Sequence, residues 1–188
     1  MITKNTGKRI NRKGNSCIGI LEKHIHETFA GLRVPGEDFV YCNSNDMLNR
    51  LDDVCDDENL LELVKNLPLL IKGCSGSGKS ALLANWLLRR ERYAQRRKNN
   101  SQDSEFVFWH SVGCTRHSTN VESLLRRLLV ELKDRFEIGR EVPIANASLS
   151  WELPRFLELA SKRGKILIVI DGLDRLLNSE NVEDSLSW

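Results

Sequence analysis

The feature that most constrains the fold is an eight-residue segment, residues 73–80, with the pattern G-x-x-x-x-G-K-[ST]. The segment reads Gly73, Cys74, Ser75, Gly76, Ser77, Gly78, Lys79 and Ser80. Glycines let a backbone wrap closely around an anion because they have no Cβ, and successive N–H groups can then point inward. The pattern indicates a phosphate-binding loop only where it follows a buried strand and opens a helix.

Both flanks of the loop fit that context. An apolar run over residues 67–72 predicts a strand buried on both faces, with Pro68 near its start. Residues 80–88 are rich in strong helix formers and predict a largely buried helix. We therefore expect the loop to bind a nucleotide triphosphate through its amides and the Lys79 ammonium, with Ser80 as a Mg²⁺ ligand. The alternative is a chance match in a glycine-rich turn.

A second motif lies downstream, where residues 165–174 read KILIVIDGLD. The apolar run predicts a central parallel strand with Asp171 at its C-terminal end, the edge at which open α/β sheets bind ligands. We interpret Asp171 as a Walker B acid that holds Mg²⁺ opposite Ser80, and Asp174 as a catalytic group that orients or deprotonates an attacking water. Two alternatives stay open: Asp171 ends its strand in a simple turn, and Asp174 caps a short helix.

The segments between the two motifs complete the prediction of the fold. Residues 105–112 predict a strand, leucines at helical spacing predict a helix through residue 135 with its N-cap within residues 118–120, and residues 151–162 predict another helix. This order indicates an α/β fold, a three-layer P-loop NTPase with a mostly parallel sheet.

These residues resemble the STAND-class NTPases and, within them, the NACHT domain of nephrocystin-type proteins. The specific parts are the loop and helix over residues 76–86 and the Asp171-Gly172-Leu173-Asp174 motif; the resemblance covers about residues 58–188. One departure bears on catalysis, because Arg175 stands where many NACHT domains place a Glu after the second acid.

The resemblance implies ATP and Mg²⁺ as cofactors and a nucleotide-dependent signalling or assembly switch. It also implies that the fold is incomplete, because a polar sensor strand should follow the second motif and only residues 175–188 remain. Slow ATP hydrolysis is therefore expected only in a longer chain, with protein partners bound through helical or repeat regions. The alternative is a non-hydrolysing nucleotide-binding or protein-interaction scaffold. A small-molecule kinase is disfavoured because no lid is recognisable, and a GTPase because no N-K-x-D motif is present.

The chain before the NTPase region predicts a disordered basic arm over residues 1–16 and a helical extension over residues 17–57, with the partial NACHT-like domain spanning residues 58–188. One helix is expected within this extension, at residues 17–32. A second helix, at residues 46–65, begins in the extension and ends beyond it. The acidic patch of this second helix is interpreted as a solvated face rather than a metal site, and the arginine-rich residues 89–98 as a helix end rather than a nucleic-acid contact. The acidic residues are Asp52, Asp53, Asp56, Asp57 and Glu58.

Charge and composition further limit the partners and the cellular compartment that we expect. The net charge of +2 gives no general attraction to nucleic acid or membranes, and the sequence has no apolar run near 18 residues. Five scattered cysteines fit a reducing compartment, so we expect a cytoplasmic protein. His110, His117 and Cys114 lack the further ligands of a zinc site and are interpreted as strand and loop residues.

Overall fold

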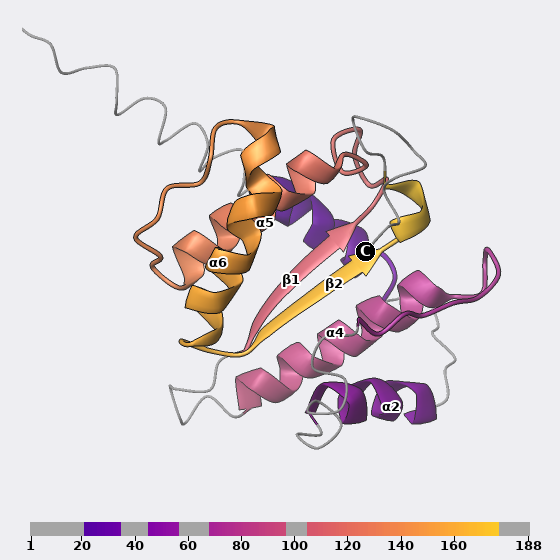
Figure 1. Ribbon diagram of the computed structural model, residues 1–188. Coiled ribbons are helices and arrows are strands. Elements are labelled where there is room, and N and C mark those ends of the chain that lie inside the picture. Colours follow the sequence, from indigo (N-terminus) through magenta and orange to yellow (C-terminus); the bar gives the residue numbers. More distant parts are fainter. Residues whose placement is uncertain (1–20, 35–44, 57–67, 97–104, 177–188) are drawn as a thin grey trace, which may run out of the picture. The chain divides into compact units, whose positions relative to one another are not determined.

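The computed structural model describes residues 21–34, 45–56, 68–96 and 105–176 of the chain (Figure 1). These residues divide between two compact units, one formed by residues 1–29 and 100–188 and the other by residues 30–99. The basic arm, residues 57–65 of the second predicted helix and residues 97–98 of the arginine-rich stretch lie outside the described residues.

The first unit contains a parallel two-stranded sheet. Strand β1 (Phe106–Ser111) pairs with strand β2 (Ile166–Asp171) in a register that sets Phe106 opposite Ile166 and Ser111 opposite Asp171. Helices α5 (Val121–Arg135) and α6 (Leu149–Ser161) lie on one side of this sheet (Figure 1). Both predicted strands and both predicted helices are confirmed, and with them the α/β class of the fold.

The core of this unit forms where apolar residues of α5 and α6 meet the sheet. Alternate residues of β1 face the helices, because side chains along a strand alternate between its faces. The Phe106 and Phe136 rings meet edge to face, with centroids 5.6 Å apart. The buried members of the core are Phe106, Phe108, Leu124, Leu128, Leu129, Leu132, Phe136, Ile138, Leu149, Phe156 and Ala160.

The bounds of the two helices follow from local chemistry. Asn120 caps α5 because its side chain accepts a hydrogen bond from the Ser123 amide at 2.8 Å. Pro154 lies inside α6, beyond the first turn, so its missing N–H removes the i→i−4 hydrogen bond that would reach Ser150 O. The amide of Gly164 donates to Ala160 O at 3.2 Å just after α6 ends. Short 3₁₀ turns also occur in this unit, at Asn146–Ser148 and Leu173–Arg175.

The second unit contains helix α2 (Asn45–Asp56) and helix α4 (Lys79–Arg96), which pack against each other. The predicted helix after the phosphate loop is therefore confirmed. The predicted strand before the loop is wrong where it can be assessed, because residues 68–74 are irregular and Leu69 and Leu70 are exposed. A strand is stabilised by its neighbours, and the described part of this unit offers no strand for it to pair with.

Among the described residues, no helix is both long and apolar enough to span a membrane.

Candidate nucleotide-binding site

The glycine-rich loop joins the irregular residues 68–72 to helix α4. Its turn is closed by the Ser77 amide, which donates to Cys74 O at 3.2 Å, and the helix starts with the Leu82 amide bonded to Gly78 O at 2.8 Å. Gly76 and Gly78 have φ values of +77° and +86°. A residue with a Cβ is strained in this left-handed region, so the path of the loop requires glycine at both positions.

The backbone N–H groups of the loop decide whether it can bind a phosphate group. Among the described residues, the N–H groups of Gly76, Gly78 and Lys79 have no backbone acceptor. They lie at the start of α4, where the helix dipole favours negative charge. Exposed amides on a left-handed turn at a helix N-terminus form the kind of concavity that binds phosphate oxygens, so the residues present fit a polyphosphate.

Lys79 supplies the positive charge of the loop. Its Nζ donates to Gly73 O and to Cys74 O, each at 2.7 Å, and lies 3.4 Å from Ser77 Oγ. The ammonium is thus held against the loop by the carbonyl groups of the loop itself. Gly73 allows this close arrangement, because a Cβ there would lie 2.9 Å from Ser77 Oγ.

Asp171 is the last residue of β2, as the sequence predicts. The residue is only 6% exposed, and its carbonyl accepts the Val112 amide at 2.8 Å. Ser111, fully buried, is its partner in the register of the sheet. A carboxylate is costly to bury unless a cation or hydrogen-bond donors accompany it, and carboxylate oxygens are ligands that Mg²⁺ prefers.

The chain turns sharply after Asp171. Gly172 has φ +79° and is the residue before the 3₁₀ turn Leu173–Arg175, whose Arg175 amide bonds to Gly172 O at 2.9 Å. The Arg175 guanidinium lies over Gly172, and its Nη1 would be 3.1 Å from a Cβ placed on Gly113. Asp174 lies inside this turn with an exposed side chain, so the alternative in which Asp174 caps a helix is wrong.

The predicted site residues fall in both units. The loop with Lys79 and Ser80 belongs to the unit of residues 30–99, whereas Asp171 and Asp174 belong to the other. The structure brings the loop residues together in one site and places Asp171 and Asp174 at the same strand end. A magnesium site shared by Ser80 and Asp171 stays a prediction.

Sequence reasoning missed a buried histidine pair at the end of β1. Helical residues 21–29 carry His26, whose Nδ1 accepts the Ser111 amide at 3.0 Å and lies 3.2 Å from Cys114 Sγ. The His26 and His110 rings have centroids 4.4 Å apart. The sequence offers no signal for this contact, because nothing in a helical pattern identifies a distant strand residue as the partner of one histidine.

Hydrogen bonds fix the tautomer of His110, and burial keeps both rings neutral. Nε2 of His110 donates to Ser118 O at 2.8 Å, so Nδ1 is the nitrogen that faces Arg127 Nη1 at 3.3 Å as an acceptor. Burial, the charge of Arg127 and His110 lower the pKa of His26 to about 3. Burial also lowers the pKa of His110 to about 4. The hydrogen bond to Ser118 O raises this pKa, and the charge of Arg127 lowers it.

The parallel strands and the glycine-rich loop before α4 are features expected of a nucleotide-binding NTPase-type domain. A family model confirms the class: the NACHT domain model matches residues 67–187, and the chain belongs to this family.

Relatives with similar sequences carry the same region within much longer proteins. A TPR repeat-containing protein of Dictyostelium discoideum is 30% identical over 168 residues, which cover 69% of this chain and 10% of that protein. Human nephrocystin-3 is 34% identical over 124 residues, which cover 64% of this chain and 8% of that protein. Nephrocystin-3 of Xenopus tropicalis is 32% identical over 116 residues, which cover 60% of this chain and 8% of that protein. The chain thus spans a tenth or less of the length of these relatives. No solved structure matches it.

Proposed function

We propose that this chain binds ATP with Mg²⁺ and acts as a nucleotide-dependent switch in signalling or assembly. The observation that carries the proposal is the loop at the start of α4, with the amides of Gly76, Gly78 and Lys79 available beside the Lys79 ammonium. When nucleotide binds, the ammonium exchanges the carbonyl groups of Gly73 and Cys74 for phosphate oxygens, which carry more negative charge.

The magnesium ion supplies charge neutralisation between the phosphates when it is bound. Ser80, at the first turn of α4, and Asp171, at the end of β2, are the residues proposed to hold it. Asp174 is exposed and close to Asp171 in the chain, which suits a role in orienting water. Hydrolysis is proposed to be slow, since Arg175 follows Asp174 and its guanidinium packs over Gly172.

The test is Mg²⁺-dependent binding and turnover of ATP, with GTP in parallel, in wild type, Lys79→Ala, Asp171→Asn and Asp174→Ala. We expect Lys79→Ala to abolish measurable binding, because it removes the only full charge of the loop. Asp171→Asn should weaken binding with Mg²⁺ but leave binding with EDTA unchanged. Wild-type affinity indistinguishable from that of Lys79→Ala would falsify the proposal.

The scaffold alternative is favoured by two exposed apolar side chains. Ile144 is 94% exposed and Trp151 is 80% exposed. Ile144 lies in a loop that Arg126 holds through Pro143 O at 2.6 Å and Ile144 O at 2.8 Å. Because hydrolysis is expected only in a longer chain, turnover is compared there: binding of ATP without turnover in such a chain, unaffected by Asp174→Ala, would support this alternative, in which protein partners bind through helical or repeat regions of the kind named in the Dictyostelium relative.

A further inference from the structure

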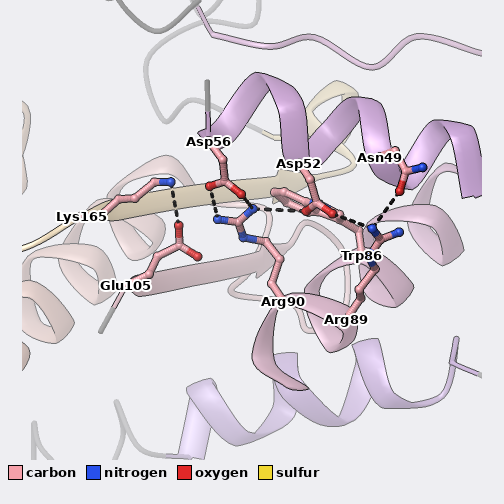
Figure 2. A network of polar contacts seen from close by, with 8 residues as sticks. All are labelled: Asn49, Asp52, Asp56, Trp86, Arg89, Arg90, Glu105 and Lys165. Atoms are coloured by element: carbon pink, nitrogen blue, oxygen red, sulfur yellow. Dashed lines mark hydrogen bonds and ion pairs between the residues drawn. The ribbon is translucent and has the colours of Figure 1, made fainter. Parts of the chain in front are cut away.

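Helix α2 makes a polar cluster with α4, the helix that begins at the phosphate loop (Figure 2). Asp52 of α2 accepts a hydrogen bond from Trp86 Nε1 at 2.8 Å and pairs with Arg89 Nη2 at 3.1 Å and Arg90 Nη1 at 3.2 Å. Residues three and four apart share one face of a helix, so a single carboxylate binds three donors on one face of α4.

Two neighbours of Asp52 extend the cluster on both sides. Asp56 accepts two hydrogen bonds from Arg90, at 3.1 and 2.9 Å, and Asn49 Oδ1 accepts one from Arg89 at 2.8 Å (Figure 2). The Arg90 guanidinium also lies 5.2 Å from the centroid of the Trp86 ring. Asn49, Asp52 and Asp56 follow the spacing of one helix face, so α2 presents a continuous polar strip to α4.

Much of this cluster is shielded from water. Trp86 is 2% exposed, the Arg90 side chain 11% and the Asp52 side chain 20%. Charge-assisted hydrogen bonds are strong, and partly buried pairs are screened less than exposed ones. The interpretation of the acidic patch as a solvated face is therefore wrong for Asp52, although Asp53 is exposed as expected.

The cluster lies on the helix that positions the phosphate site. Lys79 and Ser80 form the first turn of α4, and Trp86 follows Lys79 by about two turns, or about 10 Å. A helix transmits rotation and translation along its axis, so fixing residues 86–90 also fixes how the first turn presents the loop. Helix α2 precedes the region that the NACHT model matches.

We propose that α2 is an accessory helix that strengthens nucleotide binding, with Asp52 as the residue that positions α4. The inference rests on the proposed function, since it names a control of the same site. Coupling between two sites is reciprocal, so bound nucleotide tightens the docking of α2 by the same factor as docked α2 tightens nucleotide binding.

The test uses the 188-residue chain with ATP and Mg²⁺. Asp52→Asn keeps the size of the side chain and removes its charge. Trp86→Phe keeps an aromatic side chain, although a smaller one, and removes the N–H donor. Asp53→Asn makes the same charge change at the next, exposed position and serves as the matched control. We expect the dissociation constant for ATP to rise about fivefold or more in the first two variants and to stay unchanged in the control.

A second measurement separates positioning from simple structural support. Hydrogen exchange in residues 45–56 of the wild type should slow when ATP and Mg²⁺ are added, which a merely structural helix would not show. Unchanged exchange, or equal affinities for Trp86→Phe and Asp53→Asn, would overturn this inference while leaving the proposed function standing. Absence of ATP binding in the wild type would instead overturn the proposed function, and this inference with it.

Discussion

At the scale of single residues, Gly172 shows how one position shapes the end of strand β2. Its φ of +79° lies in the left-handed region, and the Arg175 guanidinium occupies the space that a Cβ would fill. The long Arg175 side chain can move aside to make room for a Cβ, whereas the left-handed backbone conformation of residue 172 would remain. The requirement for glycine at this position is therefore mainly conformational.

We expect Gly172→Ala to lower the free energy of unfolding by about 1–2 kcal/mol, the cost of the left-handed conformation for a residue with a Cβ. Urea denaturation followed by circular dichroism measures this change. Gly139→Ala is the matched control, because Gly139 has no atom within 4 Å of a Cβ and no left-handed φ. Equal effects of the two substitutions would show that the turn tolerates a side chain.

The buried histidine pair predicts a pH dependence of stability. The pKa values of His26 and His110 are lowered from 6.5 to about 3 and about 4, so below pH 6.5 the unfolded chain binds protons that the folded chain does not. The contribution of each histidine to the free energy of unfolding is therefore complete above pH 6.5 and is lost as the pH falls towards the lowered pKa values. Between pH 7 and pH 5 the free energy of unfolding falls by about 2 kcal/mol for each histidine.

Urea denaturation at pH 7, 6 and 5 measures this dependence, with His110→Gln and His117→Gln compared. His110→Gln should flatten the profile because it removes one of the two buried titrating groups. His117 is exposed, so His117→Gln should leave the slope as in the wild type. Parallel profiles for both variants would contradict the assignment of the pH dependence to the buried pair.

At the scale of elements, the start of α5 depends on a single cap. Asn120 accepts the Ser123 amide at 2.8 Å, which satisfies one of the amides that a helix leaves unpaired at its N-terminus. Asn120→Ala should destabilise the chain by about 1 kcal/mol, measured by thermal or urea unfolding. Asn120→Asp keeps an oxygen acceptor and should restore most of the loss. An unchanged stability in Asn120→Ala would mean that water replaces the hydrogen bond of the cap at no cost in free energy.

The elements also show where sequence reasoning works. A continuous apolar run identifies β2, and leucines at helical spacing identify α5, because both patterns are visible in the local sequence. The run at residues 67–72 has equally apolar residues, but a strand exists only through its neighbours, and local pattern carries no information about them. The same limit applies to Asp52, whose partners Arg89 and Arg90 lie on another helix.

At the scale of the whole molecule, the phosphate loop and Asp171 lie in different compact units, and the proposed magnesium site would join them. Both motifs are readable from sequence, because each depends on residue types at fixed local spacing. Whether Ser80 and Asp171 share a metal ion is not readable in this way, since they are about ninety residues apart in the sequence.

The proposed joint site gives a test that depends on magnesium. ATP with EDTA should slow hydrogen exchange around residues 73–82 alone, because the loop amides bind phosphate without the ion. ATP with Mg²⁺ should also slow exchange around residues 171–175, because the ion is proposed to bridge the phosphates to Asp171. Asp171→Asn should remove the second effect and keep the first. Protection of residues 171–175 by ATP with EDTA, or its persistence in Asp171→Asn, would show that the two units are coupled without a metal ligand at Asp171.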